Sequence, residues 1–332
     1  MKISFGLNKN RLSLQSLLLS WVFILLTMAA QAQNFGNGPL RIVSPFPPGG
    51  GTDTLGRMIA QRYTEHFGFP AIVENKTGAN GTLGAAFVAK SKGDGLTMLI
   101  VPAGYVANPA LYKSLPYDQS HDFAPVSLLA SGPLVLVTAL SLPVNNTRQF
   151  ITMAKAHPGE LNYGSPGSGA LPHLSAELFA SMSGIKLTHV PYKGPAMAIT
   201  DLISGYIQLY FMNATQALPM IETKKLRALG VTSLGRSAIA PLIPSLSESG
   251  VKGYEMTNWY GMLVPATTPK TVVSNINSEV LASLKSPEIQ KNISAGGMVV
   301  EASSAEHFTE FLKQETLKYQ KVIEWAGIRG TL

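Results

Sequence analysis

A loop rich in glycine and proline follows the first strand-like segment, and its residue types suit the binding of an anion. Residues 41–46 are mostly apolar, residues 47–51 read Pro-Pro-Gly-Gly-Gly, and an amphipathic helical pattern starts at Leu55. This order predicts a strand, a tight loop and a helix capped by Thr52 or Asp53. The first N–H groups of a helix lack intrahelical partners and lie at the positive end of the helix dipole, so a carboxylate or phosphate is favoured there.

Glycine-rich turns also occur without any ligand, and that alternative stays open for residues 49–51. The loop contains neither the Gly-Lys-Ser/Thr of a P-loop nor the Gly-x-Gly-x-x-Gly of a dinucleotide site. Nucleotide binding is therefore disfavoured.

Three further strand-to-helix junctions have similar chemistry. They span residues 78–84, 164–169 and 191–196, and the second of them leads to His173. Each combines a helix start with glycines that let a ligand approach the backbone. Two junctions precede the central apolar segment and two follow it, which predicts a cleft where two domains present helix N-termini to one anionic solute.

Short apolar segments alternate with helical patterns through the rest of the chain. Strands are predicted at residues 71–74, 98–101, 134–139, 161–164, 187–191, 207–211 and 226–231. This order predicts an α/β protein with parallel sheets, whose ligands lie at the carboxyl ends of the strands. Residues 303–306 read as a capping box before a C-terminal scaffold helix that carries Phe308, Phe311, Leu312, Tyr319, Val322 and Ile323.

The first 32 residues have the three parts of a Sec signal peptide. A basic start precedes an apolar run over residues 17–30 and a small-x-small motif that ends at Ala32. The run is shorter than the roughly 20 residues that span a bilayer. We expect export to the periplasm with cleavage near Ala32, and a permanent N-terminal anchor is the alternative.

The remaining residues suffice for about two domains and contain no cysteine. Without the leader, 23 Lys and Arg oppose 19 Asp and Glu, and no dense basic run is present, so nucleic acid is not an expected partner. Residues 126–143 carry no charge, but Gly132-Pro133 and Pro143 interrupt them. Their β-branched composition predicts buried strands that cross between the domains rather than a membrane span.

Several segments together carry a family resemblance: residues 41–53, 73–81, 94–99, 115–118, 122–126, 161–165, 173–177, 189–194 and 259–265. Through them the chain resembles the Bug-type receptors, the extracytoplasmic solute-binding components of tripartite tricarboxylate transporters. The resemblance implies a type II periplasmic binding protein fold, in which two α/β domains joined by crossing strands hold an organic acid in the cleft between them. It also implies delivery to a two-subunit membrane permease. The expected domains are residues 33–132 with 257–332, and residues 133–256.

The resemblance also implies the ligand-binding residues. A ligand carboxylate would sit on the first glycine-rich loop, partly through ordered water, at Phe46, Pro47, Pro48, Gly49, Gly50, Thr52 and Asp53. The wall of the first domain would be completed by Asn80, Gly81, Ala103 and Gly104. The second domain would contribute Ser165, Ser168, Gly169, His173, Tyr192 and Met212.

Met212 marks a departure from the family pattern. Receptors for amino acids tend to have an acidic residue in a Met-Phe-Asp-Asn run, and here residues 210–213 read Tyr-Phe-Met-Asn. An α-ammonium group would need a carboxylate to offset its lost hydration, whereas Met212 offers apolar surface. We therefore expect an acid with an apolar end to bind better than aspartate or glutamate, unless Met212 packs in the core.

Other singled-out residues have simpler interpretations. Asp53 fits a role in organising the loop better than direct contact with an anion. His173 and Glu177 have the spacing of half a metal site, but no further His or Cys cluster supports one, so neither metal nor cofactor is expected. Lys193 either pairs with a carboxylate or points into solvent. Trp259 and Tyr260 are expected to pack at the crossing strands.

An enzyme is the main competing class. A secreted hydrolase would use Ser165 or Ser168 with His173, but neither serine lies in a Gly-x-Ser-x-Gly motif and an acid partner is undefined. We therefore expect a monomeric receptor without catalytic activity. A solute sensor for a membrane signalling partner is a further alternative that the sequence does not separate from a transport receptor.

Overall fold

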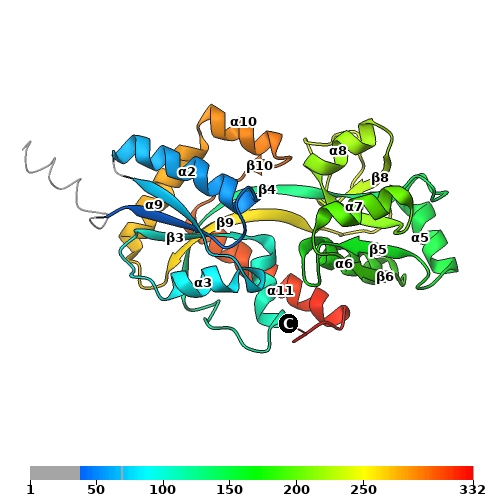
Figure 1. Ribbon diagram of the computed structural model, residues 1–332, viewed down its shortest axis with the longest axis horizontal. Coiled ribbons are helices and arrows are strands. Elements are labelled where there is room, and N and C mark those ends of the chain that lie inside the picture. The colour runs from blue at the N-terminus through cyan, green and yellow to red at the C-terminus, as the bar shows by residue number, and fades with distance from the viewer. Residues whose placement is uncertain (1–37, 69, 332) are drawn as a thin grey trace, which may run out of the picture.

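The computed structural model describes residues 38–68 and 70–331, so the signal peptide expected at residues 1–32 lies outside the described residues. Two lobes lie next to each other along the longest axis, and the strands β4 (Phe123–Ala139) and β9 (Thr257–Pro265) run between them (Figure 1). The two-lobed α/β architecture predicted from the sequence is thereby confirmed, but the sheet is mixed rather than parallel, because β4 and β9 pair antiparallel. No helix in this described part of the chain combines the length and apolarity needed to cross a bilayer.

The first lobe is built around three parallel strands. β1 (Leu40–Ser44) pairs with β2 (Ala71–Asn75) on one side and with β3 (Thr97–Pro102) on the other. α2 (Gly51–Phe67) leads from β1 to β2, and α3 (Thr82–Ala89) leads from β2 to β3. The remaining elements of this lobe are η1 (Ala79–Gly81), η2 (Ala103–Ala107), α4 (Asn108–Leu111), α9 (Lys270–Leu284), α10 (Pro287–Ala295), β10 (Val299–Val300) and α11 (Ala305–Trp325).

The second lobe repeats this plan. β5 (Asn162–Ser165) lies parallel to both β6 (Thr188–Pro191) and β7 (Leu209–Asn213). β7 and β8 (Leu226–Val231) each pair antiparallel with the second half of β4. The helices of this lobe are α5 (Thr147–Ala156), α6 (Leu171–Ser183), α7 (Pro195–Ser204) and α8 (Ala214–Glu222).

The apolar segment that the sequence assigned to a crossing is one long strand. The first part of β4 pairs with β9 as far as Pro133, and from Leu134 onward it pairs with β7 and β8. The residue types of Gly132 and Pro133 suggested a break in the strand, but β4 continues through both residues. They mark the point where its partner changes, and a Cβ at Gly132 would come within 2.6 Å of the Gly297 carbonyl oxygen.

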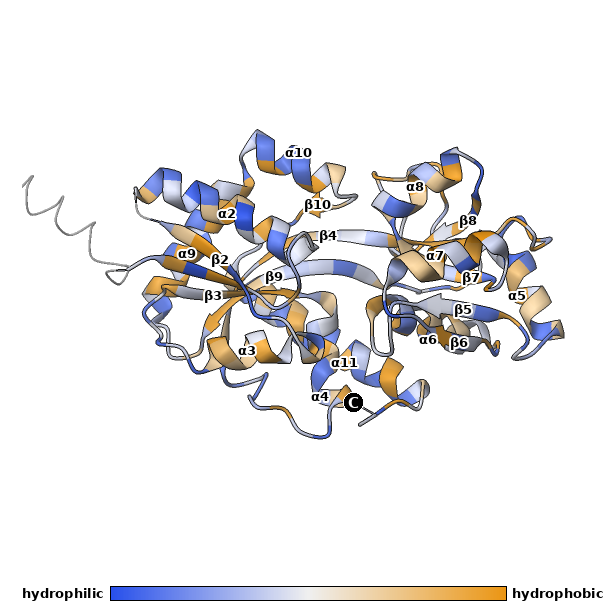
Figure 2. Ribbon diagram, in the orientation of Figure 1, coloured by the Kyte–Doolittle hydropathy of each residue, from blue (hydrophilic) through white to orange (hydrophobic). Residues whose placement is uncertain are grey.

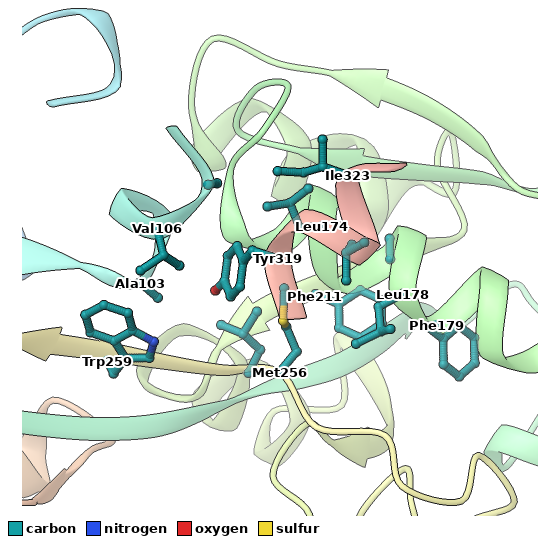
Figure 3. Packing of buried hydrophobic residues seen from close by; sticks show 14 of the residues in the cluster. Ala103, Val106, Leu174, Leu178, Phe179, Phe211, Met256, Trp259, Tyr319 and Ile323 are labelled. Carbon is teal, nitrogen blue, oxygen red and sulfur yellow. The ribbon is translucent and has the colours of Figure 1, made fainter. Parts of the chain in front are cut away.

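The C-terminal helix α11 packs on both lobes. It contacts η2 in the first lobe and α6 in the second, and Figure 3 shows its Tyr319 and Ile323 close to Leu174 of α6. The largest buried cluster therefore continues from one lobe to the other. Polar residues lie on the outer helices, as α10 illustrates in Figure 2.

The start of α11 corrects the predicted capping box. Ser304, not Ser303, is the N-cap, and its hydroxyl accepts a hydrogen bond from the N–H of His307. The Ser303 hydroxyl instead accepts one from the N–H of Leu128 on β4 at 2.9 Å. Ser303 thus ties this loop to the crossing strand, which its sequence context does not reveal.

Candidate functional site

A cavity of about 330 Å³ lies where the loops of the two lobes meet. It is lined from the first lobe by the β1–α2 loop and η1, and from the second lobe by residues 166–172 and the β7–α8 junction. Six of the residues expected to contact ligand line it: Phe46, Gly50, Thr52, Asn80, Gly104 and Gly169. A second cavity of about 540 Å³ adjoins it and shares Gly50, Gly51, Pro195, Asn213, Gln216, Asn258 and Tyr260.

The N-terminus of α2 opens into both cavities. Gly50 is the N-cap, so the prediction that Thr52 or Asp53 caps this helix is wrong, and no side chain caps it. Thr52 is buried and its hydroxyl bonds to that of Ser44 at 2.8 Å. Because Gly50 and Gly51 line both cavities and have no side chains, a ligand in the cleft can approach the backbone of this first turn.

Asp53 stabilises the loop that precedes α2. Its carboxylate accepts hydrogen bonds from the Gly49 N–H at 3.0 Å, from the Arg57 guanidinium at 3.0 Å and from the Asn75 amide at 2.9 Å. The bonds from Arg57, Gly49 and Asn75 lower the pKa of Asp53 to about 2. Asp53 is only 3% exposed and does not line the smaller cavity, which matches the expected organising role.

Asn80 is held in the cleft wall by a residue that the sequence did not single out. It has a left-handed backbone with φ of 51°, and its amide donates to Asn108 Oδ1 at 2.8 Å. Asn108 is completely buried. Gly81 and Ala103, which were also expected at this wall, do not line the smaller cavity, and Ala103 is fully buried.

Tyr260 packs at the crossing strands, as predicted, but it also lies on the cleft floor. Trp259 packs at these strands too, and its indole N–H donates to the buried Glu315 at 2.8 Å. Side chains alternate along β9, so Tyr260 faces the other way and lines both cavities. Its hydroxyl lies so close to Gly51 that any Cβ there would overlap it. Burial raises the pKa of Tyr260, so its hydroxyl keeps the proton and can donate.

The second lobe contributes a loop backed by buried polar groups. Gly169 lines the cavity, but Ser165 and His173 lie behind the loop and are almost fully buried. The Gly169 N–H donates to His173 Nδ1 at 2.9 Å, and Ser165 Oγ bonds to His189 Nε2 at 2.6 Å. His173 is therefore not a cleft-edge donor in this structure, because it is buried and does not line the cavity.

Tyr192 and Lys193, at the β6–α7 junction, line neither cavity. The Tyr192 hydroxyl donates to Asp201 at 2.7 Å. Lys193 is exposed and forms no ion pair with the residues that the structure describes. Pro47, Pro48, Gly49 and Ser168, which complete the expected set, are likewise not part of the lining of the smaller cavity, although Gly49 lines the larger one.

The expected cleft role of Met212 is wrong. Met212 is fully buried and packs with Val135 and Val137 of β4. Because side chains alternate along β7, the next residue, Asn213, reaches the cleft together with Gln216 of α8. The second lobe thus presents amide side chains where the sequence suggested a thioether.

The lining of the smaller cavity is uncharged. Among the described residues that line it, none is Asp, Glu, Lys, Arg or His. Neutral donors are available from Asn80, Asn213, Gln216, Asn258 and Tyr260, and from the backbone at the start of α2. Such a site can hold an anion through hydrogen bonds and helix dipoles, without a countercharge on a side chain.

The polar groups behind the second-lobe loop are buried and do not line the smaller cavity. Ser165 lies within hydrogen-bond distance of an imidazole, as a nucleophile would, but it is fully buried and its hydroxyl also bonds to the backbone of Gly167. His173 Nε2 and Glu177 are 3.9 Å apart. Across residues 38–68 and 70–331, no group of three or more His, Cys, Asp or Glu could hold a metal ion.

Comparisons with known proteins agree with this architecture. A family model described as "Tripartite tricarboxylate transporter family receptor" matches residues 55–328. Protein BugT of Bordetella pertussis is 30% identical over 300 residues, which cover 90% of this chain and 92% of BugT. A structure of an R. palustris protein with adipate is 35% identical and has a TM-score of 0.76, covering 88% of this chain and 99% of that one. MatC from Rhodopseudomonas palustris with bound malate is 27% identical and has a TM-score of 0.74, covering 87% of this chain and 100% of that one.

Proposed function

The chain belongs to the tripartite tricarboxylate transporter receptor family, and on that premise we propose that it captures a small organic carboxylate between its lobes and delivers it to a two-subunit membrane permease. Members of this family are solute-binding receptors rather than enzymes. We further propose that the chain is exported to the periplasm, that its leader is cleaved near Ala32, and that it acts as a monomer.

The observation that carries the proposal is the N-terminus of α2 in an uncharged cleft. Gly50 and Gly51 expose the first turn, Thr52 and Asn80 lie at its sides, and the protonated hydroxyl of Tyr260 lies directly against Gly51. The carboxylate of Asp53, which would repel an anion, is engaged by Arg57. Two relatives of the same fold have carboxylates bound, adipate in one and malate in the other.

The number of donors is consistent with tight binding. Hydrogen bonds to a charged group contribute about 1.5–3 kcal/mol each, and part of that offsets the cost of ordering the ligand. Four or five such bonds can therefore supply the roughly −8 kcal/mol that corresponds to a micromolar Kd. The apolar part of the lining, which includes Phe46, Pro102 and Phe211, suits the carbon chain of an aliphatic or aromatic acid.

Calorimetry with a panel of mono- and dicarboxylates, adipate and malate among them, tests the proposal. At least one acid is expected to bind with a Kd of about micromolar or lower. The amide or methyl ester of that acid has the same shape but no negative charge, so it is expected to bind at least about tenfold more weakly. Equal binding of the acid and its neutral analogue would contradict a carboxylate site.

Selectivity against amino acids follows from the uncharged lining. Glutarate and glutamate differ by one α-ammonium group, which loses hydration in the cleft and meets no carboxylate among the described lining residues. Glutamate is therefore expected to bind at least about tenfold more weakly than glutarate in a calorimetric comparison. Tighter binding of glutamate would show that the ammonium group finds an acceptor that this structure does not offer.

Asn213 is the position at which to change this preference, since a carboxylate at Met212 would be buried in the core. Asn213→Asp adds an anion at the cleft. It is expected to weaken the binding of glutarate and to strengthen the binding of glutamate. Asn145→Asp, at an exposed position outside the cleft, is the matched control and is expected to change neither affinity.

A further inference from the structure

A stack of aromatic and imidazole rings lies directly behind the second-lobe part of the cleft. Tyr163 of β5, His189 of β6 and His173 of α6 stack with interplanar angles of 20° or less. The ring centroids of His173 and His189 are 4.0 Å apart, and Glu177 accepts a hydrogen bond from Tyr163 beside them. The cluster does not line either interlobe cavity, so direct ligand binding does not explain it.

The two imidazoles hold opposite ends of one loop. Residues 165–170 leave β5 and enter α6, and Pro166, Gly169 and Ala170 of this loop line the cleft. At its start, Ser165 Oγ bonds to His189 Nε2 at 2.6 Å and accepts a bond from the Gly167 N–H at 3.2 Å. At its end, the Gly169 N–H donates to His173 Nδ1 at 2.9 Å.

The bond from Gly169 also fixes the form of His173. A ring nitrogen that accepts a hydrogen bond carries no proton, so His173 must be neutral with its proton on Nε2. Burial, together with the neighbouring His189, lowers the pKa of His173 to about 3, and burial lowers that of His189 to about 4. Both imidazoles therefore stay neutral, and the loop contacts persist, at any pH near neutrality.

The loop also approaches the opposite lobe. Gly169 has a φ of 78°, and a Cβ at this position would lie 2.7 Å from Cδ1 of Leu111 in α4 of the first lobe. A small shift of Gly169 would therefore alter both the cleft lining and the contact between the lobes.

Resting on the proposed function, we propose that His173 and His189 are positioning residues, which hold the 165–170 loop from behind in the conformation that receives the ligand. To hold the loop, His173 must offer a neutral acceptor at Nδ1 to the Gly169 N–H, and His189 must offer a polar partner to Ser165. Neither imidazole touches the ligand. The role differs from packing alone, because it depends on the hydrogen-bonding atom and not only on the volume of the ring.

His173→Leu and His173→Asn separate these two requirements. Leucine fills similar space without an acceptor, whereas the Oδ1 atom of asparagine can take the place of Nδ1. His157→Leu, at an exposed position after α5, is the control. We measure the affinity for the best carboxylate of the panel by calorimetry, and the hydrogen exchange of the Gly169 amide without ligand by NMR.

His173→Leu is expected to speed exchange at Gly169 and to weaken ligand binding, each by about tenfold, and His173→Asn is expected to recover most of both. If His173→Leu does not fold, Ser165→Ala removes the other anchor without changing α6, and it is expected to weaken binding in the same way. Unchanged affinity in a folded variant with a loosened loop would overturn the proposal, as would equal losses in the leucine and asparagine variants. Should the wild type bind no carboxylate, the proposed function fails, while unchanged Gly169 exchange in His173→Leu would independently refute the positioning role.

Discussion

Replacement of Gly50 by valine is expected to weaken carboxylate binding by at least about a hundredfold, which corresponds to about 2.7 kcal/mol. Gly50 is the N-cap of α2 and lines both cavities. A branched side chain there would cover the N–H groups of the first helical turn, which are the principal donors of the proposed site. Calorimetry with the best acid of the panel measures the loss.

The fold is expected to tolerate this change. Gly50 has an extended backbone with φ of −75°, and a Cβ would meet only the Pro47 carbonyl oxygen, at 3.4 Å. The Tm should therefore fall by no more than a few degrees, which reflects the weaker N-cap. Gly51 is less suitable for the test, because any side chain there would collide with Tyr260.

Gly235→Val is the matched control, since a Cβ at Gly235 would meet no atom within 4 Å and this glycine lies outside both cavities. It is expected to bind ligand like the wild type. Full-strength binding by Gly50→Val would mean that residues 49–51 form a plain turn and that the ligand sits elsewhere.

The sequence predicted the architecture well because the elements have strong local patterns. The seven strands predicted between residues 71 and 231 all occur, with ends shifted by at most two residues, apart from the one at 134–139, which forms the second half of the longer β4. β9 was not among the predicted strands, and the two-residue β10 was missed as well, since Val299 and Val300 alone carry no periodicity. The continuity of β4 through Gly132-Pro133 depends on pairing with β9, a long-range contact that local residue types do not encode.

The site was predicted less completely, because side-chain direction depends on register. The glycine-rich loop does line the cavity, but Met212 was assigned to the cleft and is buried in the core, whereas Tyr260 was expected only to pack at the crossing strands and also lines both cavities. The alternation of side chains along β7 and β9 could have suggested that Asn213 and Tyr260 line the cleft, if the buried face of each strand had been known. Asn108 had no signal at all, since its role depends on the position of Asn80 in another segment.

Asp53→Ala is expected to lower both stability and affinity, although Asp53 does not line the smaller cavity. The change leaves the Gly49 N–H and the Asn75 amide without the acceptor they share, so the loop that shapes the N-terminus of α2 loses its anchor. The low pKa of Asp53 means that the folded state favours its charged form. That contribution is present above pH 3.8 and is lost as the pH falls towards 2, so it is fully present at neutral pH.

The expected loss of stability is about 1–2 kcal/mol, because Arg57 is half exposed and its pairing is screened by solvent. A Tm lower by about 2–3 °C corresponds to this loss in a protein of this length. Affinity is expected to fall by about thirtyfold, since the ligand would then have to order the loop as it binds. Asp53→Asn, which keeps an acceptor but loses the charge, should fall between the wild type and Asp53→Ala in both measurements.

Asp118→Ala distinguishes loop organisation at the cleft from a general effect of losing a turn carboxylate. Asp118 also accepts bonds from backbone N–H groups, those of Ser120 and His121, but it lies outside both interlobe cavities. Its replacement is expected to leave affinity unchanged. If Asp53→Ala lowered the Tm and yet bound the acid like the wild type, the loop conformation would not be needed for binding, and other donors of the lining would have to form the carboxylate site. If Asp53→Ala lost both stability and affinity while Asp118→Ala kept its affinity, the buried carboxylate of Asp53 would strengthen the carboxylate site by holding the donors of that site in place.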